Sequence, residues 1–160
     1  MRSSRINWAA FIALWGGAAI LGTAYGAGWL NGIGKPDRAE AAAAGERVSF
    51  GYCFEGGGYN CVVDGDTIWL KGVKIRIADI DAPETHDPRC PSEKALGDRA
   101  TVRLHDMLET GPISLQSIDR DEDSYGRKLR IVLVNGESVG DTLVEEGLAR
   151  WYGHGRRPWC

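Results

Sequence analysis

The stretch from Cys61 to Glu84, CVVDGDTIWLKGVKIRIADIDAPE, most strongly constrains the fold of this chain, because it mixes strand-like apolar residues with ionisable ones. Three carboxylates, Asp66, Asp81 and Glu84, lie there with one guanidinium, Arg76. Acidic side chains in strands that bury apolar residues are costly unless a cation offsets their charge. A hard divalent metal suits oxygen ligands. The stretch predicts a metal site for an anionic substrate, and a hairpin with solvated acids is the alternative.

The N-terminal part is of a different kind. Arg2 and Arg5 precede Trp8–Leu30, a run of 23 residues without a charge. Such a run is long enough to span a bilayer and longer than the apolar core of an ordinary signal peptide. The basic flank predicts a cytoplasmic N-terminus with the rest of the chain carried across the membrane.

Three parts are therefore expected: a signal anchor or signal peptide at 1–34, a charged linker at 35–46 and one domain at 47–160. Small-residue patterns at 39–41 and 42–44 would suit a signal peptidase, so both an uncleaved anchor and a cleaved signal stay open. Either way we expect the domain on the periplasmic or extracellular side. The membrane is then a partner through residues 8–30, and no protein partner is indicated.

Cysteine usage agrees with export. Cys53, Cys61, Cys90 and Cys160 form an even set, which allows three disulfide pairings. No pair has CxxC spacing and no histidine lies at zinc-finger distance, which argues against a structural zinc site. We favour Cys53–Cys61, closing a small glycine-rich loop, with Cys90–Cys160, although geometry decides disulfides.

The charge balance limits the kind of partner. The chain has 19 basic and 22 acidic residues. Without the four basic and two acidic residues of the first 45, the remainder has 15 basic and 20 acidic residues, a net charge of −5. Proteins that bind nucleic acid by charge alone are usually basic. This balance argues against tight non-specific binding to nucleic acid.

Short strands separated by turn residues dominate the exported part. Residues 48–52 have strand character, and five further strands are expected from apolar alternation and turn chemistry: Cys61–Val63, Thr67–Leu70, Val73–Ile80, Ile113–Ile118 and Lys128–Val134. Asn135-Gly136 is the strongest hairpin turn signal in the chain. Residues 119–125 are expected to be a polar loop whose acids, residues 121–123, are solvated.

Two helices are expected beside these strands. One runs from Ser92, as N-cap, to Glu109, with leucine and alanine at four-residue spacing on its buried face. A shorter one covers Val139–Glu146, with Gly147 just after its end. The fold class is thus α+β, mainly β. A five-stranded OB-fold barrel with two packed helices is the best match, and such barrels often bind oligonucleotides or sugars.

Four short motifs, in this order, resemble the staphylococcal nuclease (thermonuclease) family. They are DGDT at 64–67, RIADIDAPE at 76–84, YGR at 125–127 and LVEEGLA at 143–149, and the resemblance spans about residues 61–151. It implies an SNase-like OB-fold and a Ca²⁺-dependent phosphodiesterase that cleaves DNA and RNA. Nucleic acid would then be the substrate.

The resemblance also implies roles for individual residues. Asp66 and Asp81 would hold Ca²⁺ through their carboxylates, and the backbone carbonyl of Ala82 would be a third ligand. The reference nuclease has threonine at that last position, but a main-chain ligand tolerates alanine. Asp64 would lie beside these ligands without binding the metal.

The remaining roles concern the phosphodiester. Glu84 would be the general base or orient the attacking water, and Arg76 and Arg127 would bind the phosphate. Arginine suits both positions, because its fork matches phosphate oxygens. Tyr125 would contact a neighbouring phosphate. The alternatives are that Arg76 only neutralises Asp79 or Asp81 and that Arg127 is an ordinary exposed loop residue.

Besides Ala82, the sequence departs from the family pattern at three positions. Ser124 stands where the reference nuclease has lysine, and Gly153 and Gly155 stand where it has two tyrosines that flank the base. The tail aromatics Trp151 and Trp159 could stack on bases or pack on the domain. The competing hypothesis is a catalytically weak or inactive OB module that binds nucleic acid or an envelope polysaccharide.

Overall fold

The computed structural model describes residues 45–54, 57–155 and 157–160. The anchor or signal predicted at 1–34, and nearly all of the linker at 35–46, lie outside the described residues. Within the described ranges, no helix combines the length and the apolar character needed to cross a membrane.

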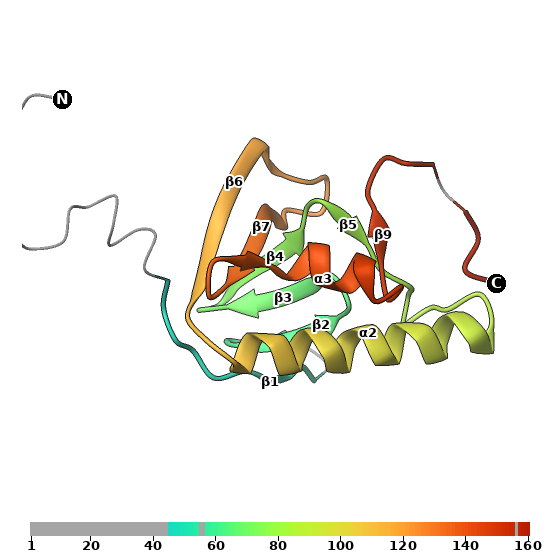
Figure 1. Cartoon of the computed structure of the whole chain (residues 1–160), viewed down its shortest axis with the longest axis horizontal. Helices are drawn as coiled ribbons and strands as arrows, with labels where there is room; N and C mark the ends of the chain where they lie inside the picture. Colours follow the sequence, from blue (N-terminus) through green and yellow to red (C-terminus); the bar gives the residue numbers. More distant parts are fainter. Residues whose placement is uncertain (1–44, 55–56, 156) are drawn as a thin grey trace, which may run out of the picture. The chain divides into compact units, whose positions relative to one another are not determined.

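One mixed sheet forms the centre of the domain (Figure 1). Its strand order is β1-β2-β3-β4-β7-β6, with β8 paired to β7. The bounds are β1 (Gly51–Tyr52), β2 (Cys61–Asp64), β3 (Thr67–Leu70), β4 (Val73–Ile77), β6 (Ile113–Glu122), β7 (Lys128–Val134) and β8 (Glu137–Ser138). A second, two-stranded sheet joins β5 (Ile80–Asp81) to β9 (Arg150–Trp151).

The β2–β3–β4 meander has the predicted hairpin between its last two strands. Lys71 and Gly72 have positive φ values of 53° and 78°, as a two-residue turn of this kind requires. The register places Thr67 opposite Arg76. Ile75 and Ile77 alternate with Arg76 and are buried in the core, so Arg76 leaves the strand on the other face.

Strand β4 pairs in parallel with β7, which lies about 50 residues further along the chain. The register sets Arg76 opposite Leu129, two residues beyond Arg127. A parallel pair needs a long crossover, and here α2 (Pro91–Glu109) and β6 provide it. This pairing brings the motif around Arg76 next to the loop that carries Arg127.

Within the described residues, the strands do not form the closed five-stranded barrel that was predicted. They make an open path, in which β1 and β6 are the ends. An isolated antiparallel bridge between Glu46, which precedes β1, and Ile113, the first residue of β6, has both N–H···O distances at 2.8 Å. The prediction of a mainly β, OB-like fold with two helices is confirmed, whereas strand closure is limited to this bridge.

The N-cap of helix α2 lies two residues earlier than predicted. Cys90 is its N-cap and Pro91 occupies the first turn, where a missing N–H costs nothing. Ala100, Leu104 and Leu108 are fully buried, which confirms the predicted apolar face. The helix runs along the side of the sheet at β2 (Figure 1).

Helix α3 (Val139–Glu145) ends one residue before its predicted end. The Ser138 side chain caps it by accepting a hydrogen bond from the Asp141 backbone N–H. Gly147 follows with φ of 69°, the conformation that favours glycine after a helix end. Residues 135 and 136, with φ of 53° and 84°, form the predicted turn between β7 and β8.

Three strand predictions need correction. The predicted strand 73–80 is two strands, because the chain changes partner between Ala78 and Asp79. The Ala78 N–H still bonds to the carbonyl of Arg130 in β7, whereas the Asp79 carbonyl accepts from the Tyr152 N–H. Strand β6 continues to Glu122, through part of the predicted loop, and β1 is only two residues long. Ion pairs of Asp121 with Lys128 and Arg130, both at 2.6 Å, stabilise the extension of β6.

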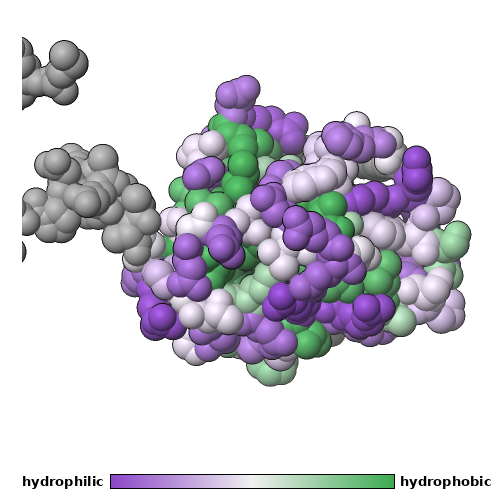
Figure 2. Space-filling view, in the orientation of Figure 1, coloured by the Kyte–Doolittle hydropathy of each residue, from purple (hydrophilic) through white to green (hydrophobic). Residues whose placement is uncertain are grey.

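Both disulfides follow the favoured pairing, Cys53–Cys61 and Cys90–Cys160. The first closes the loop before β2. The second joins the last residue of the sequence to the N-cap of α2. The face of the molecule in Figure 2 is mostly hydrophilic, and hydrophobic residues gather there over β6.

Candidate active site

Asp66 lies in the turn between β2 and β3, and its carboxylate points into the protein. The Asp64 side chain shapes the turn by accepting from the Asp66 N–H at 3.1 Å. Asp66 Oδ1 accepts from the Thr67 hydroxyl at 3.0 Å, and Oδ2 accepts from the Ala82 N–H at 2.9 Å. Asp66 is only 7% exposed. These bonds fix its orientation.

A glycine between the two aspartates allows this turn to approach its neighbours. A Cβ atom at Gly65 would lie 2.7 Å from the Cβ of Ala100 on α2 and 2.8 Å from that of Ala82. Any side chain would push the turn away from the helix. The glycine of the DGD motif is therefore required for packing, whereas its two aspartates serve the chemistry of the site.

Arg76 joins two of the predicted carboxylates. Its Nη1 lies 2.8 Å from Asp66 Oδ2, and its Nη2 lies 3.7 Å from Asp81 Oδ1. Nη1 also donates to the Ile77 carbonyl at 2.9 Å. Of the two partners named in the alternative, Arg76 pairs with Asp81 and, among the described residues, forms no ion pair with Asp79. The structure thus brings Asp66, Arg76 and Asp81 together.

The charge of Asp66 is incompletely balanced. Burial raises its pKa to about 7, although Arg76 and the hydrogen bonds from Ala82 and Thr67 act in the opposite direction, and the nearby Asp64 raises it further. An additional cation would compensate this buried charge. Because all the available donors are oxygens, a hard divalent ion such as Ca²⁺ fits the chemistry of the residues.

Glu84 follows the buried Pro83 in the loop between β5 and α2. Burial raises its pKa, the charges of Asp66 and Asp81 raise it too, and Arg76 lowers it. Glu84 is therefore within electrostatic reach of all three residues of the site. Among the described residues, no group donates a hydrogen bond to its carboxylate.

A different group in the described residues has the spacing of metal ligands. Sγ of Cys90, a carboxylate oxygen of Glu93 and Sγ of Cys160 lie within 4.8 Å of one another. Both sulfurs belong to the same disulfide, so neither is a thiolate that could bind a metal. This group does not replace the predicted oxygen ligands Asp66, Asp81 and the carbonyl of Ala82.

The loop before β7 presents Tyr125 and Arg127, and Asp123 organises it. Asp123 Oδ1 accepts from the backbone N–H groups of Tyr125 and Arg127 at 2.9 and 3.0 Å. Its Oδ2 accepts from Arg127 Nε at 2.6 Å. Burial would raise the pKa of Asp123, but these hydrogen bonds lower it. Asp123 is not the free solvated acid that the sequence suggested.

The Arg127 guanidinium lies 5.4 Å from the centre of the Tyr125 ring, which is 83% exposed. Within the described ranges Arg127 forms no ion pair with Asp66, Asp81 or Glu84, and its two Nη atoms have no recorded hydrogen-bond partner. The strand pairing places its loop next to β4. The Arg127 side chain is 25% exposed, so it is not the ordinary exposed loop residue of the alternative, and both Nη groups remain available to donate.

The surroundings of Asp81 were not predicted from the sequence. Arg150 Nε lies 3.2 Å from Asp81 Oδ2, and the Trp159 ring lies against the Arg150 guanidinium. A cavity of about 210 Å³ lies at the same place, lined by Asp81, Arg150, Trp151, Tyr152, Gly153 and Gly155. Packing of Trp159 on the domain was one of the two predicted roles for this residue, but no sequence signal indicated Arg150 as its partner.

Asp79 is a half-buried acid near this site. Burial raises its pKa, as does the charge of Asp141. Its Oδ1 has no hydrogen-bond partner among the described residues. A Cβ atom at Gly140 would lie 2.8 Å from its Oδ2, so this glycine makes room for the carboxylate at the start of α3.

Comparison with known proteins identifies the family to which this domain belongs. The fold and site define a mainly β, OB-like domain with a carboxylate–arginine centre. A family model described as "Staphylococcal nuclease homologue" matches residues 74–158, more than half of the chain. This chain belongs to that family, as its motifs predicted.

Curated relatives agree with the assignment. Endonuclease YncB of Bacillus subtilis is 38% identical over 93 residues, which cover 55% of this chain and 44% of that protein. Micrococcal nuclease of Shigella flexneri is 34% identical over 108 residues, covering 58% of this chain and 57% of the relative. Protein ParB of Escherichia coli is 34% identical over 109 residues, 59% and 56% of the two chains. The chain thus spans less than two thirds of each relative.

Proposed function

We propose that this chain is a Ca²⁺-dependent nuclease that hydrolyses phosphodiester bonds of DNA or RNA. The observation that carries the proposal is the contact of one guanidinium, Arg76, with two carboxylates, Asp66 and Asp81, inside a motif of a nuclease family. Relatives named endonuclease and micrococcal nuclease support the same reaction class.

Arg76 and Arg127 bind the phosphate in this proposal. A phosphodiester is anionic and repels nucleophiles, so the reaction needs donors directed at its non-bridging oxygens. Arg127 uses its Nε for Asp123, which orients the fork and leaves both Nη atoms to donate to an oxygen. Tyr125, on the same loop, reaches the neighbouring phosphate.

Glu84 accepts the proton of the attacking water at a carboxylate oxygen. A general base works best when its pKa lies near the working pH, and burial together with nearby acids raises the pKa of Glu84 in that direction. The residue has no competing side-chain partner among the described residues. It is thus free to take the proton while Asp66 and Asp81 serve as ligands.

Asp66 and Asp81, with the carbonyl of Ala82, would hold the metal ion. Bound Ca²⁺ would supply positive charge close to the phosphate oxygens. The Ala82 N–H bonds to Asp66 Oδ2, so the backbone of the third ligand is already tied to the first.

We further propose that the domain acts outside the cytoplasm, held at the membrane by residues 8–30 or released after cleavage. The uncharged run after Arg2 and Arg5 supports export, and two disulfides agree with an oxidising compartment. The mass of the mature protein distinguishes an anchor from a cleaved signal.

The decisive experiment is incubation of the protein with single-stranded DNA or RNA in Ca²⁺ and, separately, in EGTA. Cleavage that needs Ca²⁺ and disappears in EGTA is the expected result. Binding without cleavage in either condition would instead favour the inactive OB module. Cleavage that persists in EGTA would contradict the metal dependence.

A further inference from the structure

Asp81 lies between two arginines, and the second of them has no role in the site described above. Its Oδ1 is 3.7 Å from Arg76 Nη2, whereas its Oδ2 is 3.2 Å from Arg150 Nε. The second contact follows from the strand pairing, because β5 and β9 are antiparallel with Asp81 directly opposite Arg150. Side chains directly opposite in such a pair lie on the same face.

Arg150 is held from its other side by an aromatic ring. The centre of the Trp159 ring lies 3.7 Å from Arg150 Cζ, a distance at which a guanidinium stacks on an indole. The Arg150 side chain is only 23% exposed. Stacking restricts the plane of the guanidinium, so Nε stays directed at the carboxylate.

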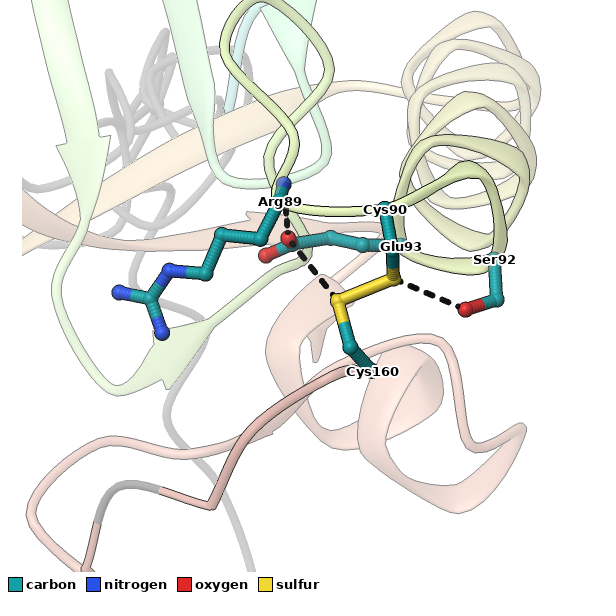
Figure 3. Close-up of a disulfide and its surroundings, with 5 residues drawn as sticks. All are labelled: Arg89, Cys90, Ser92, Glu93 and Cys160. Carbon is teal, nitrogen blue, oxygen red and sulfur yellow. Dashed lines mark hydrogen bonds between the residues drawn. A yellow bond between two sulfur atoms is a disulfide. The ribbon is translucent and has the colours of Figure 1, made fainter.

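Trp159 in turn is fixed by a covalent bond at the next residue. Cys160 forms the disulfide with Cys90, the N-cap of α2 (Figure 3). Glu93, 2% exposed, lies beside this disulfide and accepts the Arg89 backbone N–H at 2.7 Å. The Cys90–Cys160 disulfide therefore lies in a well-packed part of the protein.

We infer that Arg150 is a positioning residue for Asp81, and that Trp159 and the Cys90–Cys160 disulfide hold it in place. Arg150 occupies Oδ2 and so leaves Oδ1 directed at Arg76 and the side of Asp66. The inference rests on the proposed function, since it treats Asp81 as a cation ligand. It adds that the disulfide at the end of the sequence sets the affinity of the site for its cation.

The physical reason is side-chain order. Without the stack, Arg150 and Asp81 gain rotamers that cation binding must then restrict. Restricting one rotamer-rich side chain weakens binding roughly three- to tenfold. Trp159 and the disulfide both act by holding the Arg150 side chain in place. The effects of removing them on Ca²⁺ affinity should therefore not add.

The test compares the affinity of the full chain for Ca²⁺, measured by calorimetry without nucleic acid. Trp159→Leu keeps every charge and the disulfide, and Cys90→Ser/Cys160→Ser removes the disulfide that holds the residue after Trp159. We expect each to raise the Kd for Ca²⁺ about three- to tenfold. The variant that combines all three substitutions should bind Ca²⁺ no more weakly than Cys90→Ser/Cys160→Ser. Trp159→Phe, which keeps an aromatic ring, should have most of the wild-type affinity for Ca²⁺.

Two control variants are available. Cys53→Ser/Cys61→Ser removes the other disulfide, and Trp151→Leu removes the neighbouring exposed indole; both should leave the Kd for Ca²⁺ unchanged. A purely structural role would lower the melting temperature of the variants without changing this Kd. An unchanged Kd in folded Trp159→Leu protein overturns the inference even if the disulfide variant fails to fold.

The two hypotheses fail in different measurements. If the wild type binds Ca²⁺ and the variants bind it more weakly, but no nucleic acid is cleaved, the proposed function is wrong and the inference stands. If the wild type cleaves in a Ca²⁺-dependent way and the variants bind Ca²⁺ normally, only the inference is wrong. A wild type that binds no Ca²⁺ contradicts both.

Discussion

Gly97 lies directly against the Pro83 carbonyl oxygen: a Cβ atom at position 97 would come within 2.6 Å of it. It would also lie 3.2 Å from the Glu84 carbonyl oxygen. Helix α2 therefore touches the backbone of the loop that carries the proposed general base. The absence of a side chain at position 97 sets the distance between the helix and this loop.

Gly97→Ala should displace Glu84. The contact is with backbone atoms, which cannot rotate away as a side chain can, so the loop or the helix must move. We expect turnover to fall about tenfold or more, since small misplacements of a reacting group are costly. Gly51→Ala is the control, because a Cβ atom there meets nothing within 4 Å. Alanine favours helices, so a stabilised variant with wild-type turnover would contradict this prediction.

Removing the charge of Glu84 or the donors of Arg127 should disable the reaction. Glu84→Gln cannot accept a proton, and Arg127→Ala loses the fork that binds phosphate. Each should lower turnover by roughly two orders of magnitude or more. Single-turnover cleavage of a labelled oligonucleotide in Ca²⁺ measures the effect. Near-normal cleavage by both variants would refute the assignment of the site.

Asp123→Ala should act on Arg127 without touching the substrate. The carboxylate holds the loop through two backbone N–H groups and the Arg127 Nε, so its loss frees the guanidinium. We expect kcat to fall about tenfold, as for a misplaced catalytic group. Asp121→Ala is the control, because Asp121 is an exposed acid of β6 that pairs with Lys128 and Arg130 instead. Equal activities in the two variants would refute the positioning role.

In the metal-free protein, Asp66 should make the folded state less stable as pH rises from about 4 to about 7. Burial raises its pKa from 3.8 to about 7 on folding. Between these values the folded protein keeps a proton that the unfolded chain has lost, so the free energy of unfolding falls with increasing pH. Above pH 7 the full penalty is present.

Urea denaturation in EGTA between pH 4.5 and pH 8 measures this dependence. Asp66→Asn cannot titrate, so the stability of the wild type should fall relative to this variant as pH increases. Ca²⁺ should bind more weakly below pH 7, where a proton competes for the Asp66 carboxylate. Parallel stability curves for the two proteins would show that Asp66 is ionised throughout this range.

Local signals predicted the parts of the fold that depend on neighbouring residues. The bounds of β3 and β7 agree with the predicted strands, because alternation and turn residues such as Asn135-Gly136 lie within the same few residues. The division of the strand after Ile77 could not be predicted this way. It depends on β9, about 70 residues downstream, which takes over the pairing at Ile80.

The site also has parts that follow from short local motifs and parts that depend on residues far apart in the sequence. The family motifs indicated Asp66, Arg76 and Asp81, and the structure brings these three together. The contacts of Arg150 with Asp81 and Trp159 depend on a strand pair and a disulfide between distant residues. No short motif encodes them, so sequence reasoning left the tail without a defined place.

The Cys90–Cys160 disulfide has a consequence for resistance to proteolysis. The loop before β7, with its exposed Tyr125, is a natural target for a protease, and a single cut there would separate Arg127 from the carboxylates along the chain. Because the disulfide spans 70 residues that include this loop, the two pieces would remain one covalent molecule. The pairing of β4 with β7 could then keep a nicked domain assembled, and separating the pieces would require a reductant as well as a denaturant.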